Sequence, residues 1–178
     1  MEIIEGQADM HLRQYLAQTL HGGDVRQCAA TANVEEVFAL MKDDDSRVAN
    51  HAAWVMTHLP KAADEWLQHH ADELISHAIS TNNEAQRRLT MTVLLRVEFS
   101  KDLLRTDFID LCLMTAADPN QPAGLRSVSI KLAYRQCRHY PELLGELRET
   151  LLFIDTDTAL PAVRHCRNKI LQLCNLPQ

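Results

Sequence analysis

The chain has 178 residues, of which 46% are hydrophobic and 24% are charged, and its formal net charge is −6. This length and balance are typical of one globular domain or a small repeat array that buries a core. The negative charge argues against a protein whose whole surface attracts nucleic acid. No apolar run approaches the ~20 residues that cross a bilayer, and residues 1–6 lack the basic and apolar regions of a secretory signal. We therefore expect a cytoplasmic protein without membrane contact.

Glycine and proline are scarce, with five and six residues, and because both are costly inside helices the composition favours an all-α fold. The first predicted helix spans residues 7–20, where apolar side chains recur at helical spacing. Gly22 and Gly23 are expected to end it, since glycine readily takes the left-handed conformation of a helix stop. We expect residues 1–23 to form a capping helix within a single domain over residues 1–178.

Four long helices are predicted after this cap, at residues 46–59, 85–99, 123–139 and 161–174. A shorter amphipathic helix precedes each of them, at residues 34–41, 71–79, 108–116 and 144–153. Short pieces are expected at residues 24–30, 66–67, 103–104 and 143–144. Each unit is therefore predicted to contain a short, a middle and a long helix.

Each long helix begins after a turn that contains Asp or Asn, and it then carries an early arginine. These arginines recur at steps of 40, 39 and 38 residues, as Arg47, Arg87, Arg126 and Arg164. Self-similarity at such a period, with helices on both sides of the turn, is typical of stacked helical repeats. In the first turn, at residues 43–45, one aspartate is expected to cap the long helix and another to pair with Arg47.

The turns and arginines resemble those of HEAT and armadillo-type repeat proteins, and the resemblance covers residues 24–174. It implies a right-handed α-α superhelix, a short solenoid of about four repeats. It also implies that Arg47, Arg87, Arg126 and Arg164 form a structural ladder, in which each arginine bonds the acidic or amide turn of its own or a neighbouring unit. The second turn departs from the pattern, because Asn82 and Asn83 replace Asp. The family implies a fold and a habit of binding, but no chemistry.

Positive charge is concentrated on the predicted long helices, which hold eleven of the eighteen Lys and Arg and a single acid, Glu98. In HEAT-like stacks the last helix of each unit lines the inner, concave wall, so the resemblance implies a basic groove on an acidic body. Such a surface favours ligands of opposite sign, and arginine suits carboxylate and phosphate groups. The predicted binding residues are Arg88, Arg96, Lys131, Arg135, Arg138, Arg167, Trp54 and Tyr134.

A purely structural interpretation of this charge pattern stays open. Four of the eleven basic residues are the ladder arginines, and exposed charges contribute little individually. Acids also gather in turns because they cap helix starts, and this alone separates the two signs.

The first long helix has a polar face that contains a tryptophan. Its apolar face is Val48, Ala49, Ala52, Val55, Met56 and Leu59, and its opposite face is Arg47, Asn50, His51, Trp54 and His58. A tryptophan among polar groups at helical spacing is typical of a residue that anchors a partner. The alternative is that Trp54 packs beneath the adjoining short helix near Trp66.

Metal chemistry finds little support in the histidines. His51 and His58 are seven residues apart, as are His70 and His77. This spacing is about 10 Å along a helix, too far for both rings of a pair to reach one zinc ion. We expect no metal ion and no cofactor.

The five cysteines stand alone, without a Cys-x-x-Cys pair, and are expected to be buried and reduced. Cys137, beside Arg135 and Arg138, is alternatively a thiol whose pKa is lowered by positive charge. No nucleophile elbow, phosphate loop, dinucleotide fingerprint or metalloprotease motif occurs in the chain.

These features favour a non-enzymatic scaffold that binds a protein, or an acidic peptide, on the basic face. The alternative is nucleic-acid binding or base excision of the kind performed by DNA-alkylation-repeat glycosylases, which are also helical stacks with a basic concave face. Such an enzyme needs a positioned carboxylate, and Glu98 would have to supply it. A homodimer or other assembly role is a further alternative.

Overall fold

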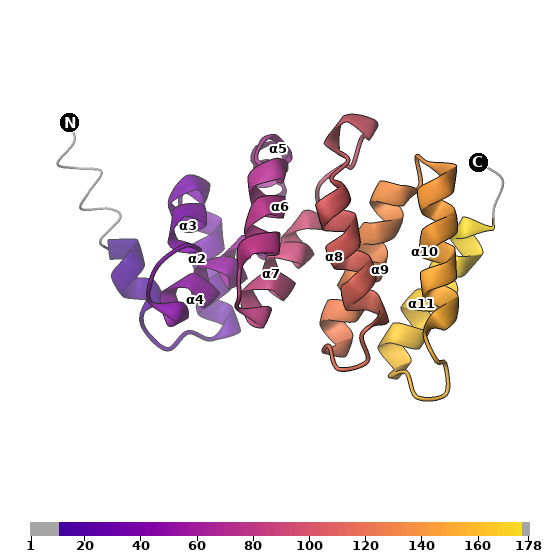
Figure 1. The fold of residues 1–178 in the computed structure, drawn as a ribbon. Coiled ribbons are helices and arrows are strands. Elements are labelled where there is room, and N and C mark those ends of the chain that lie inside the picture. Colours follow the sequence, from indigo (N-terminus) through magenta and orange to yellow (C-terminus); the bar gives the residue numbers. More distant parts are fainter. Residues whose placement is uncertain (1–10, 176–178) are drawn as a thin grey trace. The chain divides into compact units, whose positions relative to one another are not determined.

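The computed structural model describes residues 11–175, and these residues form helices and connecting turns without a strand (Figure 1). The all-α class predicted from the composition is confirmed. The chain divides into two compact units, Met1–Arg96 and Val97–Gln178; the single domain expected over residues 1–178 stays a prediction. Among the described residues, no helix has the length and apolar character needed to cross a membrane.

The first unit begins, in its described part, with a helix at residues 11–16. The elements that follow are α2 (Gly22–Thr31), α3 (Val34–Leu40), α4 (Ser46–Met56), η1 (Lys61–Ala63), α5 (Asp64–His69), α6 (Ala71–Ser80) and α7 (Glu84–Leu94). Helix α4 packs against α2, α3 and α7, and α7 also packs against α6. The buried side chains of α4, Val48, Ala52 and Val55 among them, belong to the apolar face expected from its periodicity.

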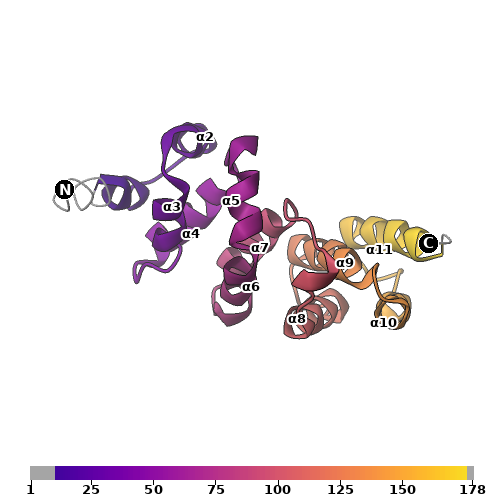
Figure 2. The same ribbon diagram turned by 90° about the horizontal axis from the view of Figure 1, so that it is seen from above.

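The second unit contains η2 (Lys101–Leu103), α8 (Thr106–Ala117), α9 (Ala123–Cys137), α10 (Pro141–Phe153) and α11 (Pro161–Cys174). These helices form two layers, with α8 beside α10 and α9 beside α11 (Figure 2). The long helices α9 and α11 begin where the sequence predicts them to begin. Leu143 and Leu144 do not form a separate short piece, because Pro141 opens α10 and both leucines are part of that helix.

The first two long helices end earlier than predicted. Helix α4 ends at Met56, where the Thr57 hydroxyl donates to the Trp54 carbonyl at 2.7 Å. Helix α7 ends at Leu94, and the backbone N–H groups of Leu95 and Arg96 donate to carbonyls three residues earlier. Arg96 and Glu98 therefore lie beyond α7, and Glu84 is an acid in its first turn. The long helices are less purely basic than the predicted boundaries suggested.

The glycine stop expected for the leading helix is wrong. Gly22 and Gly23 are the first two residues of α2, and no described glycine has a positive φ. The leading helix ends before Ala17 in the structure. Residues 7–10 of the predicted helix lie outside the described residues. Asp24 instead fixes the start of α2, because its carboxylate accepts from the His21 N–H at 2.8 Å.

The polar turns act as helix caps. Asp45 accepts from the Arg47 N–H at 2.9 Å, and Asn83 accepts from the Ala85 N–H at 3.0 Å. The expected pairing of a second aspartate with Arg47 is wrong, since the Asp43 carboxylate holds Arg13 through bonds of 2.7 and 2.9 Å. The bonds from Arg13 lower the pKa of Asp43 below its ordinary value.

The recurring arginines bond backbone carbonyls in the structure. Arg87 donates to the Ala78 carbonyl at 3.1 Å and to that of Thr81, and Arg126 donates to the Ala116 carbonyl at 3.0 Å. Arg164 reaches the Thr156 carbonyl at 3.3 Å. The last carbonyls of a helix have no intrahelical donor, so Arg87 and Arg126 satisfy the ends of α6 and α8.

Arg47 differs from the other three recurring arginines. Arg87, Arg126 and Arg164 are each the fourth residue of their helix, whereas Arg47 is the second residue of α4. It reaches the Ala17 carbonyl at 3.5 Å, beyond the leading helix. The regular spacing in the sequence therefore hides a shift of register in the first rung.

The cysteines behave as small apolar residues. Cys28, Cys112, Cys137 and Cys166 are free and buried, and Cys174 is free and partly exposed. Burial raises the pKa of the Cys137 thiol to about 12. The alternative of a thiol activated by the neighbouring arginines is therefore wrong.

We expect Arg126→Ala to lower the free energy of unfolding by about 2–4 kcal/mol, because it removes a buried guanidinium and leaves the Ala116 carbonyl without its donor. Arg164→Ala is the matched control, since Arg164 has the same place in its helix and is exposed; its cost should stay below about 1 kcal/mol. Urea denaturation followed by circular dichroism measures both values. Equal losses would contradict a structural role for the buried rung.

Thiol labelling by Ellman's reagent at pH 8 should modify Cys174 first. The four buried thiols should react at least about tenfold more slowly, because burial keeps them protonated and inaccessible. Cys174→Ser should remove the fast phase, and all thiols should react after unfolding. Fast labelling of Cys137 in the Cys174→Ser protein would contradict this assignment.

Candidate functional site

Several predicted binding residues are bonded within the protein. Arg96 donates to the carbonyls of Leu59 at 2.8 Å and Pro60 at 2.9 Å, and it also pairs with the Asp64 carboxylate. These bonds connect the chain just beyond the C-cap of α7 to the chain that follows α4. Arg96 therefore has a structural role in the first unit.

In the second unit, Arg135, Arg138 and Arg167 are also engaged. Arg135 reaches the Val97 carbonyl at 3.3 Å, and Arg138 lies 3.7 Å from the Glu98 carboxylate. Arg167 donates to the Leu151 carbonyl at 2.7 Å. These three cations are therefore held by neighbouring groups of their own unit.

Two histidines extend the same pattern. His51 on α4 bonds the Leu16 carbonyl at 2.7 Å, and His139 after α9 bonds the Phe99 carbonyl at 2.9 Å. Like Arg96 and Arg135, each bonds a carbonyl at or after the end of an earlier helix. Much of the polar face predicted to bind a partner thus joins successive repeats.

Four predicted binding residues have no side-chain hydrogen bond or ion pair with a described residue: Arg88, Lys131, Trp54 and Tyr134. Arg88 and Lys131 are exposed, and the two aromatic residues are half-buried. The structure brings Trp54 and Arg88 together in one cleft. Lys131 and Tyr134 lie on α9, in the other unit.

This cleft, here called the α4–α7 cleft, has a volume of about 370 Å³ in the first unit. Helix α4 and its C-cap supply one wall and α7 supplies the other, and the two helices are in contact. The lining residues are Asn50, His51, Trp54, Thr57, Arg88, Leu89 and Thr92. Because the walls are packed helices, these side chains are held on rigid elements.

Helical spacing explains why these residues converge. Asn50, Trp54 and Thr57 follow one another at steps of four and three residues along α4 and its cap, and Arg88 and Thr92 are four apart on α7. Residues at such steps share one face of a helix. The Thr92 hydroxyl donates to the Arg88 carbonyl at 2.7 Å, and the Arg88 side chain is exposed.

The polar groups of the cleft can bind a ligand. Since a carbonyl only accepts, His51 Nδ1 carries the proton in its bond to Leu16, and Nε2 of the neutral ring is an acceptor. The buried oxygen of the Asn50 amide has no partner among the described residues. Arg88 adds donors suited to a carboxylate, and Trp54 and Leu89 add apolar surface.

The alternative in which Trp54 packs near Trp66 is not what the ring contacts show. The centroid of the Trp54 ring lies 6.3 Å from those of His51, on the same helix, and His58, which follows the C-cap of that helix. Trp66 instead stacks on His70 at 3.9 Å and contacts Phe38 at 5.5 Å. Trp54 thus remains a wall of the cleft.

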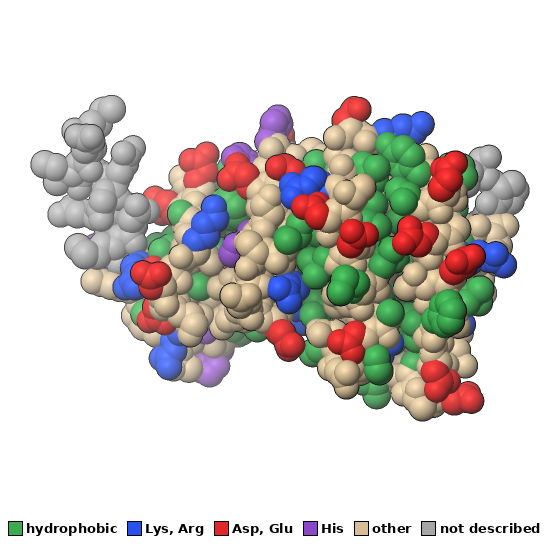
Figure 3. Space-filling model, in the orientation of Figure 1, with side chains coloured by type: hydrophobic (Ala, Val, Ile, Leu, Met, Phe, Trp, Pro, Cys, Tyr) green, Lys and Arg blue, Asp and Glu red, His purple; other side chains and the backbone are tan. Residues whose placement is uncertain are grey.

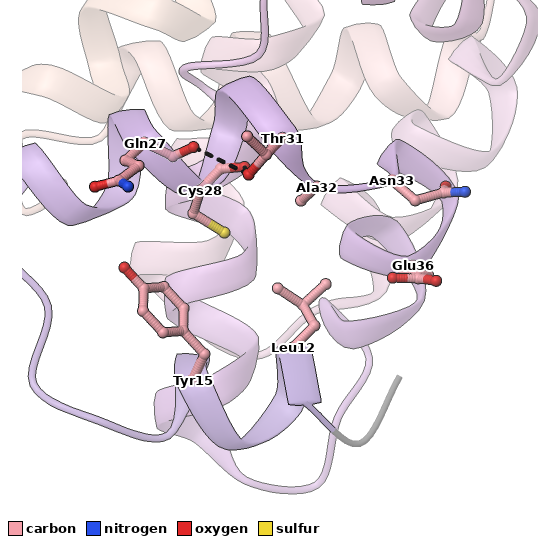
Figure 4. Close-up of a pocket in the computed structure, with 8 residues that line it drawn as sticks. All are labelled: Leu12, Tyr15, Gln27, Cys28, Thr31, Ala32, Asn33 and Glu36. Atoms are coloured by element: carbon pink, nitrogen blue, oxygen red, sulfur yellow. Dashed lines mark hydrogen bonds between the residues drawn. The ribbon is translucent and has the colours of Figure 1, made fainter. Parts of the chain in front are cut away.

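A larger hollow of about 600 Å³ lies between the leading helix, α2 and α3 (Figure 4). Its walls include Leu12, Tyr15 and Cys28, and Glu36 is the charged side chain among its lining residues. The Tyr15 hydroxyl donates to the Asp24 carbonyl at 3.4 Å, and burial raises the pKa of Cys28. Unlike the α4–α7 cleft, this hollow has neither an arginine nor a tryptophan among its lining residues.

The groups needed for the enzymatic alternative do not converge. The Glu98 side chain is 88% exposed and pairs with Arg138, so it is a solvated ion pair. It lines none of the hollows described in this section. Among residues 11–175, no three His, Cys, Asp or Glu side chains lie close enough to hold a metal ion.

Comparison with known proteins identifies the repeat. A family model described as a HEAT repeat domain matches residues 12–174. No curated protein and no solved structure gave a match. The match extends from the leading helix to the end of α11 and covers most of both units. On this evidence the chain belongs to the HEAT repeat family.

Proposed function

We propose that this protein is a non-enzymatic scaffold that binds an acidic segment of a partner protein in the α4–α7 cleft. HEAT repeats generally form helical scaffolds and mediate protein interactions, which is the broad class for this chain. The observation that carries the proposal is the pairing of an unbonded arginine, Arg88, with a half-buried tryptophan, Trp54, in the same cleft.

Arg88 supplies the charge preference in this proposal. Its neighbour Arg87 donates to carbonyls at and beyond the end of α6, whereas the exposed Arg88 guanidinium is not bonded to a described side chain. A free guanidinium at a cleft favours Asp, Glu or a terminal carboxylate through paired N–H donors. Charge complementarity of this kind sets partner choice and the rate of encounter.

Trp54 supplies the apolar contact. Tryptophan and arginine are the residue types most enriched among those that dominate binding energy. Leu89 lies beside Trp54 in the cleft, so an apolar residue next to the acid would cover both. The unbonded amide oxygen of Asn50 would bind a backbone N–H of the same segment.

Of the basic residues predicted to bind a partner, this proposal keeps only those whose side chains have no bond to a described residue. Lys131 is exposed on α9, and it lowers the pKa of Cys166 together with Lys169, against the larger effect of burial. These lysines and Tyr134 would give the second unit its own acid-binding contacts. Arg96, Arg135, Arg138 and Arg167 would support the fold instead.

Trp54 fluorescence tests the proposal directly. Trp66→Phe leaves Trp54 as the only tryptophan of the chain, and phenylalanine retains a ring beside His70 and Phe38. This protein is titrated with a short peptide of Leu, Asp and Glu, and with a matched peptide in which Lys replaces each acid. The acidic peptide should change the Trp54 emission and bind, while the basic peptide should not.

Charge reversal separates the cleft from the overall charge. In this background Arg88→Glu should weaken the acidic peptide by about tenfold or more. Lys61→Glu makes the same charge change at an exposed site of the same unit, and it should alter affinity by less than about threefold. Equal effects of the two reversals, or equal binding of the two peptides, would refute an acid-binding cleft.

A further inference from the structure

Four large apolar side chains of the second unit are exposed to solvent. Among the described residues, the exposed large hydrophobic side chains are Met114 at 72%, Leu152 at 53%, Phe153 at 88% and Leu160 at 58%. All four belong to the second unit. Exposed apolar groups that gather in this way mark interaction sites more often than those scattered singly.

Two of these side chains line a hollow of about 290 Å³, here called the α8–α10 hollow. Phe153 and Leu160 line it together with Ala117 and Pro119. Met114 is three residues before Ala117 on α8 and therefore shares its helix face. Helices α8 and α10 pack against each other, and the hollow lies beside their C-terminal ends.

Carboxylates border this surface. Asp110 lies one turn before Met114, and Glu149 lies one turn before Phe153; both are exposed and without a bonded partner among the described residues. Asp155 lines the hollow itself, and hydrogen bonds from Asp157 and Thr158 lower the pKa of its carboxyl. Figure 3 shows the same mixture, with red carboxylates among green apolar side chains over α8 and α10.

The carboxylates supply the negative charge of this surface. The carbonyl ends of α8 and α10 are bonded by Arg126 and Arg167, and the exposed Arg164 bonds the Thr156 carbonyl in the loop after α10. Arg126, the cation in the wall, is buried, bonds the Ala116 carbonyl and is balanced by Asp118. Arg148 on α10 lies toward Cys174, on the side that faces α11.

We propose that the α8–α10 surface docks a basic amphipathic helix of a partner protein, which inserts an apolar side chain into the hollow and places Lys or Arg on Asp110, Glu149 and Asp155. An amphipathic helix laid in an apolar groove is a recurrent mode of peptide recognition. Phe153, an aromatic side chain that lines the hollow and is 88% exposed, would be the main anchor.

Charge disfavours the other occupants. A second copy of the chain would bring the two sets of carboxylates together in an isologous contact, and like charges at an interface oppose association. An anionic membrane would be repelled by the same groups. An acidic peptide of the kind proposed for the α4–α7 cleft would be repelled as well, so the two surfaces select opposite partners.

The test uses a helical peptide of Leu and Lys, labelled with fluorescein, and a matched peptide of Leu and Glu. Fluorescence anisotropy with the full chain should show binding of the Leu/Lys peptide only. Phe153→Ser removes the anchor without changing charge, and because Phe153 is 88% exposed the fold should tolerate it. We expect this variant to bind the Leu/Lys peptide about tenfold more weakly.

A pair of charge variants separates this surface from the net charge of −6. Asp110→Asn with Glu149→Gln should weaken the Leu/Lys peptide several-fold and reduce the salt dependence of binding. Glu65→Gln with Glu73→Gln removes the same charge from exposed positions of the first unit and should leave affinity unchanged.

Four outcomes would overturn the proposal. The first is equal binding by all variants, which would mean that the peptide follows net charge alone. The second is binding of the Leu/Glu peptide, or no binding of either. The third is a dimer in analytical ultracentrifugation that Phe153→Ser converts to a monomer. The fourth is binding of phosphatidylserine vesicles that Phe153→Ser abolishes. Arg88→Glu should leave binding of the Leu/Lys peptide unchanged. A result against this proposal can therefore be distinguished from a result against the proposed α4–α7 cleft.

Discussion

The carbonyl groups at the ends of helices are the constraint on which this structure depends. Each short helix leaves its last carbonyls without an intrahelical donor, and burial of such a group without a partner is costly. Side chains of neighbouring helices supply the missing donors, as Arg87 does for α6, Arg126 for α8 and Arg167 for α10.

This constraint changes the meaning of the charge distribution. Arginine has several donors on a long side chain, so it can satisfy a carbonyl while its stem packs against apolar neighbours. Arg96 and Arg135 do the same for the chain that follows α4 and α7. Much of the positive charge on the long helices is therefore structural. The basic side chains that remain for binding are few.

The remaining free groups define two surfaces with opposite chemistry. In the first unit, Arg88 and Trp54 are the basis of the proposed cleft for an acidic segment. In the second unit, Phe153 and its bordering carboxylates are the basis of the proposed docking surface for a basic helix. Together the two proposals describe a protein that holds two different partners, and HEAT repeats generally mediate protein interactions.

The helices could be predicted from the sequence because their apolar residues recur at helical spacing, and the long helices α9 and α11 begin at the predicted residues. The partners of the arginines could not, since a backbone carbonyl carries no sequence signal and its position depends on packing. Periodicity does contain part of the answer. Arg87 lies one turn from the buried Met91, whereas Arg88 lies one turn from Thr92.

The same reasoning applies to Phe153. Leu147, Leu151 and Ile154 form the buried stripe of α10 and its cap at helical spacing, which leaves Leu152 and Phe153 off that face. The helical periodicity therefore predicts that these two side chains are exposed, but it does not predict the hollow. Hollows arise where helices from different parts of the chain meet, and a periodic pattern does not record that.

The most direct test of this account compares Arg96→Ala with Arg88→Ala in equilibrium unfolding. Both changes remove one guanidinium at the C-terminal side of the first unit, but only Arg96 bonds Leu59, Pro60 and Asp64. We predict that Arg96→Ala lowers the free energy of unfolding by about 2 kcal/mol or more, and that Arg88→Ala changes it by less than about 0.5 kcal/mol. Equal losses, or a larger loss for Arg88→Ala, would contradict the division between structural and free arginines.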